Sequence, residues 1–80
     1  MDDTQISSRI SKLAEEERRL EEAHSGTGLS SEEQDKLRSI EVELDQCWDL
    51  LRQRRARRHA GKDPDDAAAR PESTVENYLQ

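Results

Sequence analysis

The segment that decides the fold runs from Leu44 to His59 and reads LDQCWDLLRQRRARRH. Its first half carries apolar residues at helical spacing, and its second half places five arginines within seven positions. The apolar spacing extends backwards through Ile40 and Leu37, so the pattern predicts one long amphipathic helix over about 31–60. The apolar stripe of this helix ends at Leu51, where basic residues replace apolar ones.

A shorter amphipathic helix is predicted over about 4–24. Its apolar residues recur with the same helical spacing, at Ile6, Ile10, Leu13 and Leu20. Two glycines in the Ser25–Gly28 segment should end this helix, because glycine readily terminates helices and weakens their interior. Ser30 and Glu33 form a capping-box pattern at the start of the second helix, and Gly61 is its expected stop.

The short glycine-containing connection predicts an all-α fold, an antiparallel two-helix hairpin of the coiled-coil type over 1–61. In the expected register, Ile6 faces Leu51. The same register places two acidic residues of the first helix beside two arginines of the second: Asp2 and Asp3 near Arg54 and Arg55.

The remaining residues, 62–80, are predicted to form a flexible acidic tail with short helical turns. Asp63 followed by Pro64 resembles a helix start, and a turn or two could continue through the alanines at 67–69. Beyond Pro71, three side chains could share one face and order the tail by contacting an apolar surface: Val75, Tyr78 and Leu79.

The composition predicts a small core that a second copy completes. The chain has 80 residues, of which 30% are hydrophobic and 40% charged, and a chain this short buries only about 60% of its unfolded surface. Trp48 lies at the edge of the apolar stripe, which suggests a homodimeric four-helix bundle with Trp48 as an interface anchor. The alternative is that Trp48 packs over its own first helix near Ile6 and Ile10.

We term the five arginines at 52, 54, 55, 57 and 58 the arginine block. With Lys62 they give residues 52–62 six Lys and Arg residues and no acid within an otherwise acidic chain. Three interpretations stay open: ion pairing within the chain or between subunits, contact with a protein partner, and binding of RNA or DNA phosphates. The predicted partner-binding residues are Trp48, Arg54, Arg55, Arg57, Arg58, Val75, Tyr78 and Leu79.

No motif predicts catalysis, and we expect a non-enzymatic protein without a cofactor or metal. Cys47 occupies an apolar-stripe position, where a thiol usually acts as a small buried hydrophobe, although a nearby arginine could make it redox-sensitive. Glu21 and His24 have the spacing of di-iron helical bundles, but the second helix lacks such a pair. A solvated helix end accounts for them better.

A cytoplasmic location is expected. The single cysteine excludes an intramolecular disulfide, and the acidic N-terminus does not resemble a signal peptide. No run of apolar residues is long enough to predict a membrane-spanning helix.

Three segments of the chain resemble a family of short bacterial proteins catalogued as domain of unknown function 2630. These segments read RISKLAEEERRL, LDQCWDLLRQRRARR followed by DPDDA, and RPESTVENYLQ. The resemblance covers nearly the whole chain and implies a small helical protein. It implies no activity, cofactor or binding residue.

Taken together, the residues predict a helical interaction or adaptor protein. It would self-associate through the surface around Trp48 and contact a partner through the arginine block and the tail. The alternative function is RNA or DNA binding by the helix over Arg52 to Arg58.

Overall fold

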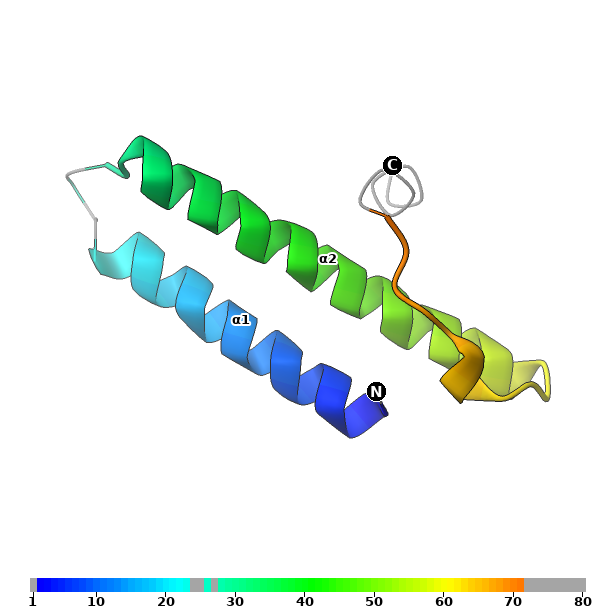
Figure 1. Ribbon diagram of the computed structural model, residues 1–80. Helices are drawn as coiled ribbons and strands as arrows, with labels where there is room; N and C mark the ends of the chain where they lie inside the picture. The colour runs from blue at the N-terminus through cyan, green and yellow to red at the C-terminus, as the bar shows by residue number, and fades with distance from the viewer. Residues whose placement is uncertain (1, 24–25, 27, 72–80) are drawn as a thin grey trace.

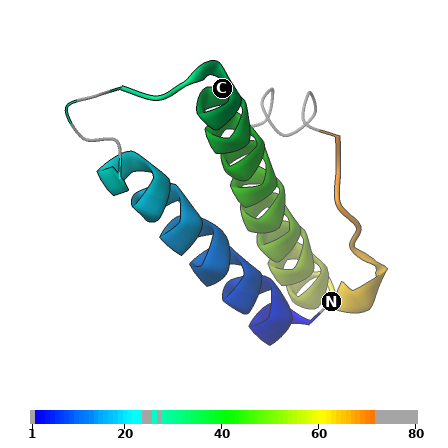
Figure 2. The ribbon, with the colours of Figure 1, turned by 60° about the vertical axis from the view of Figure 1, so that its left-hand side comes forward.

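The computed structural model describes residues 2–23, 26 and 28–71 (Figure 1). In these ranges the chain forms two α-helices, α1 (Asp3–Ala23) and α2 (Ser31–His59), then a short 3-10 helix, η1 (Pro64–Asp66), and no strand. The two helices pack antiparallel (Figures 1 and 2), and α2 extends beyond the start of α1 (Figure 1). The expected all-α helical hairpin is confirmed, and each helix end lies within one residue of the predicted bound.

A polar side chain caps the N-terminus of each α-helix. Asp2 Oδ1 accepts a hydrogen bond of 2.8 Å from the Gln5 backbone N–H, while the Asp2 N–H donates to Gln5 Oε1. The predicted capping box at Ser30 and Glu33 is present, with hydrogen bonds of 3.2 and 3.0 Å. These bonds satisfy backbone N–H groups that a helix start otherwise leaves unpaired.

The end of α2 depends on Gly61, as the sequence predicted. Gly61 has a φ of +72°, a left-handed conformation that strains other residues. This turn lets the Lys62 N–H donate to the Arg57 carbonyl at 2.8 Å and the Gly61 N–H donate to the Arg58 carbonyl at 3.1 Å. The paired bonds form a Schellman motif, which reverses the chain direction after the helix.

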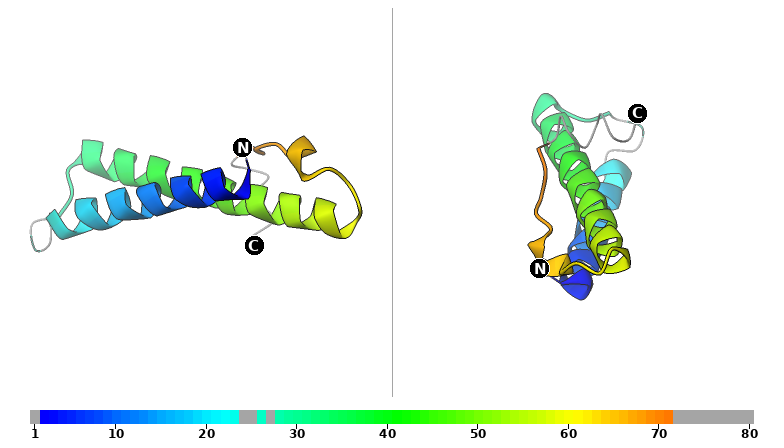
Figure 3. Two further views of the ribbon diagram at one scale, coloured as in Figure 1. Left: turned by 90° about the horizontal axis from the view of Figure 1, so that it is seen from below. Right: turned by 90° about the vertical axis from the view of Figure 1, so that its right-hand side faces the viewer.

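The apolar seam between the helices is narrow and only partly covered. Within the described residues, the buried apolar side chains are Ile6, Leu13 and Ile40, with 0, 2 and 5% exposure. The other predicted seam residues are half-buried: Ile10, Leu20, Leu37, Leu44, Cys47 and Leu51. The molecule measures 50 × 25 × 16 Å, so two helices alone cannot enclose a thick core (Figure 3).

Two charged contacts fix the register of the seam. Arg9 Nε lies 2.5 Å from Glu43 Oε2, and Arg54 Nε lies 2.5 Å from Asp3 Oδ1. The predicted proximity of Asp3 to Arg54 is therefore confirmed. Hydrogen bonds from Arg54 and Arg58 hold the pKa of Asp3 below its usual range.

The tail does not continue as a helix through its alanines. The helix η1 ends at Asp66, and Ala67 has extended dihedral angles. Residues 67–71 run back along α2 (Figures 1 and 3). Gln53 Nε2 donates to the Ala68 carbonyl at 2.9 Å, and Gln46 Nε2 donates to the Arg70 carbonyl at 3.2 Å. Side chains of α2 thus take the place of helical hydrogen bonds, and this part of the predicted flexible tail is docked.

A buried carboxylate holds this extended segment at its far end. Asp49 is 0% exposed and accepts two hydrogen bonds from Arg70, one of which is 2.8 Å long. Gln53 Nε2 donates a third bond of 3.0 Å. The hydrogen bonds from Arg70 dominate over the effect of burial and lower the pKa of Asp49. Asp49 is therefore ionised at neutral pH and binds the tail as a charged pair.

Replacing Asp49 with Asn should release the tail and leave the hairpin helical. Asn cannot offer two charged oxygens to Arg70, and an imperfectly paired buried group costs about 1–3 kcal/mol. Backbone amide relaxation by NMR should show faster motion at residues 67–70, with unchanged helical circular dichroism. Asp35→Asn, on the exposed surface of the same helix, is the control. Equal tail motion in both variants would show that Asp49 does not hold the segment.

Acid should destabilise the fold through Asp3 and Asp49. The pKa values of both carboxyl groups are lower in the folded chain than in the unfolded chain. Their contribution to the free energy of unfolding is therefore complete above about pH 5 and is lost as the pH falls through the folded-state pKa values. Glu17 acts in the opposite direction, because burial and then Glu21 and Glu41 raise its pKa. Protonation of Glu17 therefore stabilises the fold slightly.

Thermal unfolding measured between about pH 7 and pH 2 should give a melting temperature that is level or slightly rising down to about pH 5 and falls below about pH 4. Asp49→Asn should reduce that fall. A melting temperature that increases throughout this range would contradict the assignment.

Candidate functional site

One member of the arginine block is buried at the base of the hairpin. Arg54 follows Leu51 by three residues, so it continues the seam of α2 and is only 6% exposed. Its guanidinium contacts Asp3 Oδ1 at 2.5 Å, Asp65 Oδ1 at 3.0 Å and the Pro64 carbonyl at 3.1 Å. Arg54 was predicted to bind a partner, but these contacts join α1, α2 and η1 and leave little of it accessible.

Two further arginines also contact acids of the same chain. Arg58 occupies the next seam position, and its Nη2 lies 2.9 Å from Asp3 Oδ2. Arg52 Nη2 lies 3.7 Å from Asp49 Oδ1. The sequence left open whether ion pairs within the chain neutralise the arginine block. Arg52, Arg54 and Arg58 form such ion pairs in the structure.

Arg55 and Arg57 are the members that stay available. Arg55 is exposed and Arg57 half-exposed, and neither forms an ion pair with the residues that the structure describes. Consecutive residues of an α-helix are rotated by about 100°, so these two side chains leave α2 on nearly opposite sides. The block therefore does not form one continuous basic stripe.

The largest exposed apolar side chain lies on the side of α2 that carries Arg55. Trp48 is 52% exposed and is the only large hydrophobic residue so exposed within the described ranges. Leu44 and Leu51, one helical turn away on either side, are themselves half-buried. Together they form an apolar strip along the seam that α1 leaves partly open.

Acidic and basic residues border this strip at opposite ends. We define the Trp48 face as the residues of α2 that follow the tryptophan's side of the helix at heptad spacing: Glu41, Asp45, Trp48, Arg52 and Arg55. Its acidic end lies near α1, since Glu41 contributes to the raised pKa of Glu17. The face thus combines an aromatic centre with two charged ends of opposite sign.

Cys47 behaves as part of the seam. Its thiol is half-buried, and burial raises its pKa, with a further increase from Glu43 that Arg9 opposes. The alternative interpretation was that a nearby arginine, Arg52 or Arg55, would lower this pKa if the thiol were exposed. Neither arginine produces a reactive thiolate, because a raised pKa keeps the thiol protonated at neutral pH.

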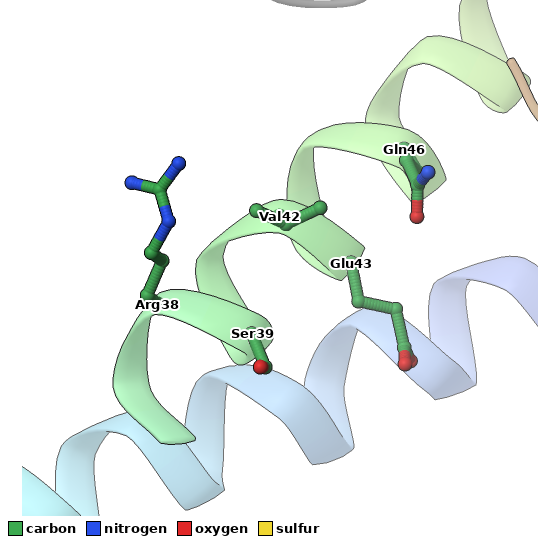
Figure 4. Close-up of a pocket in the computed structure, with 5 residues that line it drawn as sticks. All are labelled: Arg38, Ser39, Val42, Glu43 and Gln46. Carbon is green, nitrogen blue, oxygen red and sulfur yellow. The ribbon is translucent and has the colours of Figure 1, made fainter. Parts of the chain in front are cut away.

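One surface hollow contains both an acidic and a basic side chain, but the two point in different directions (Figure 4). This hollow of about 290 Å³ lies along α2 and is lined by Arg38, Ser39, Val42, Glu43 and Gln46. Figure 4 shows Glu43 directed toward α1, where it binds Arg9, while Arg38 points away from the hollow. The acid and the base therefore do not converge on a common point where substrate could react.

Four residues named by the sequence lie outside the described ranges: His24, Val75, Tyr78 and Leu79. The proposed pairing of Glu21 with His24 and the apolar face of the tail stay predictions. In the part of the chain that is described, no group of three or more His, Cys, Asp and Glu side chains is arranged to hold a metal ion. Neither described α-helix has an apolar stretch of the length that a membrane crossing needs.

The sequence did not identify the contact between Asp49 and Arg70. The two residues lie 21 positions apart and are joined only because the chain reverses at Gly61. The heptad spacing of Glu41, Trp48 and Arg55, in contrast, is a signal that the sequence contains. This spacing is less conspicuous in the sequence than the apolar spacing of the neighbouring seam.

The internal role of Arg54 predicts that two neighbouring arginines respond differently to the same substitution. Arg54→Gln removes the charge between Asp3 and Asp65 and should lower the melting temperature clearly. Arg55→Gln should change it little, because exposed surface residues contribute weakly to stability. Thermal unfolding by circular dichroism measures both. Equal losses would show that Arg54 is no more structural than its neighbour.

The chain also resembles known proteins over nearly its whole length. It is 52% identical over 77 residues to the uncharacterized protein Rv0898c of Mycobacterium tuberculosis and to the uncharacterized protein Mb0922c of Mycobacterium bovis. Each alignment covers 95% of this chain and 88% of the relative. No solved structure matches the chain.

The family model for proteins of unknown function (DUF2630) matches residues 2–80 and confirms the resemblance seen in the sequence. Neither the family description nor the names of the relatives carry an activity, a ligand or a partner. The chain therefore belongs to the family of proteins of unknown function known as DUF2630.

Proposed function

We propose that this chain is a non-enzymatic helical interaction protein that self-associates through the Trp48 face and contacts a partner protein through exposed arginines and the tail. The exposure of Trp48 carries the proposal. A tryptophan that is 52% exposed beside half-buried leucines leaves apolar area in water, which a docked surface would remove.

The small amount of internal burial supports self-association. Three apolar side chains are buried within the described residues, two of them on α1 and one on α2. A second hairpin laid against the open side of the seam would cover Leu44, Trp48 and Leu51. Homodimers with twofold symmetry are the commonest protein assemblies, and tryptophan is enriched among residues that dominate interface energies.

The partner-binding surface is narrower than the whole arginine block. In the single hairpin Arg55, Arg57 and the exposed part of Arg58 are accessible, whereas Arg54 is engaged by Asp3 and Asp65. Arg55 belongs to the Trp48 face, so Arg57 and Arg58 are the arginines left for a partner protein once that face is covered. Accessible arginines suit contacts with carboxylates of an acidic partner. The contribution of Val75, Tyr78 and Leu79 is part of the proposal.

Binding of RNA or DNA is the weaker alternative. A nucleic-acid site aligns several cations along the phosphates, and it often adds aromatic residues that stack on bases. Arg55 and Arg57, the members of the arginine block without an ion pair in the described residues, leave α2 on different sides. The best-placed aromatic residue, Trp48, has acids at 41 and 45 beside it, which would repel a phosphate backbone.

Trp48→Ala should weaken self-association. Loss of a central aromatic anchor typically costs at least about 2 kcal/mol, so the dissociation constant should rise by roughly 30-fold. Trp48→Phe keeps an apolar ring at this position and is the matched control, with a much smaller increase. Sedimentation velocity across a concentration series measures both variants against the natural sequence. A natural protein that stays monomeric at high micromolar concentration would end the self-association proposal.

A further inference from the structure

The Trp48 face has a charge order that reverses about its centre. Along α2 its residues follow a 4-3-4-3 spacing, which is the spacing of a second coiled-coil seam on one helix. The two positions before the tryptophan are acidic and the two after it are basic: Glu41, Asp45, then Trp48, then Arg52 and Arg55. A half-turn about an axis that passes through Trp48 perpendicular to the helix places the acidic positions where the basic ones were, and the basic positions where the acidic ones were.

The outer charges of the face are not neutralised by the residues that the structure describes. Glu41 and Arg55 are both exposed, and neither forms an ion pair with any residue of the described ranges. Glu17 and Glu21 of α1 also lie at the acidic end. Burial raises the pKa of Glu17, and the negative charges of Glu21 and Glu41 raise it further. This end therefore has an excess of negative charge that a cation from outside the hairpin would relieve.

The spacing of these charges distinguishes the two directions in which a second α2 could lie. Glu41 and Arg55 are each seven residues from Trp48, or roughly 10 Å along the helix axis. In a parallel pair, each charge would meet its own copy, Glu41 against Glu41 and Arg55 against Arg55. In an antiparallel pair centred on Trp48, each glutamate would meet an arginine.

We propose that a second copy of this chain occupies the Trp48 face, with the two α2 helices antiparallel about a twofold axis at Trp48 and Glu41 of each copy paired with Arg55 of the partner subunit. This arrangement rests on the proposed self-association and specifies its geometry. Each interaction occurs twice in the dimer, as an isologous interface requires.

The two parts of the face have different roles in this dimer. Burial of Trp48 and its neighbouring leucines provides most of the affinity, whereas the bordering charges select the antiparallel direction. Like charges placed opposite one another at an interface are strongly unfavourable, so the acidic and basic ends exclude the parallel pair and shifted registers.

Charge reversal at the two outer positions gives a test in which two defective variants repair each other. Glu41→Arg creates two repulsive arginine pairs in its homodimer, and Arg55→Glu creates two repulsive glutamate pairs. In a heterodimer, the E41R chain carries arginine at both 41 and 55, and the R55E chain carries glutamate at both. Each arginine then faces a glutamate, so both contacts become attractive. The double variant E41R/R55E restores both contacts in a homodimer.

Sedimentation velocity should show that each single variant dimerises at least about tenfold more weakly than the natural sequence. An equimolar mixture and the double variant should recover dimerisation to within about threefold. Native mass spectrometry of the mixture should show the heterodimer as the predominant dimer, because the variants differ in mass. Asp35→Arg and Arg57→Glu, which carry equivalent charge changes outside the Trp48 face, should dimerise like the natural protein and not favour each other.

Misfolding does not account for the expected defects. Glu41→Arg replaces one acid of a cluster with Glu17 and Glu21, so it should not weaken the hairpin, and unchanged helical circular dichroism of each variant is the control. A monomeric natural protein overturns both this geometry and the proposed function. A dimer that Trp48→Ala weakens but that charge reversal leaves unchanged, or a mixture without heterodimer preference, overturns the antiparallel geometry alone.

Discussion

The guanidinium of Arg54 joins the three elements of this fold. A buried charge is strongly unfavourable unless it is paired, and Arg54 meets that requirement with Asp3 from α1 and with Asp65 and the Pro64 carbonyl from η1. The start of the chain, the end of α2 and the reversed tail must therefore lie together. The Schellman turn at Gly61 is the geometric condition for this meeting, because it returns the chain toward α2.

Charged side chains continue the packing where the apolar residues end. The seam of α2 passes through Ile40 and Leu51 and then reaches Arg54, which faces Asp3 just as the apolar residues face those of α1. On another side of the helix, Asp49 binds Arg70 and fixes the extended segment. A chain with few apolar residues thus positions its segments by paired charges, which add specificity of placement more than hydrophobic stability.

This division of charge also defines what the surface can do. The arginines that face α1 and η1 are neutralised there, while Arg55 and Arg57 project into solvent on different sides. The same thin architecture leaves Trp48 half-exposed, since α1 covers only one side of the seam. The proposed protein contact rests on this aromatic centre bordered by opposite charges, which supports that proposal better than it supports phosphate binding.

The sequence by itself determined the features that depend on near neighbours. Helix bounds followed from apolar spacing, the capping box at Ser30 and Glu33 from side chains three residues apart, and the stop at Gly61 from glycine's freedom to adopt positive φ. Even the approach of Asp3 to Arg54 followed, because an antiparallel hairpin with a short loop fixes the register. The family resemblance added no function to this.

Only the tertiary structure decided how the arginine block and the tail are used. Arg54 and Arg55 are neighbours with identical side chains, yet one continues the seam and is buried while the other is exposed. The contact of Asp49 with Arg70 depends on the path of an extended segment, which has no periodic signal in its residues. Local chemistry fixes helices and their ends, whereas the choice of partner for a charge depends on distances that exist only once the chain has folded.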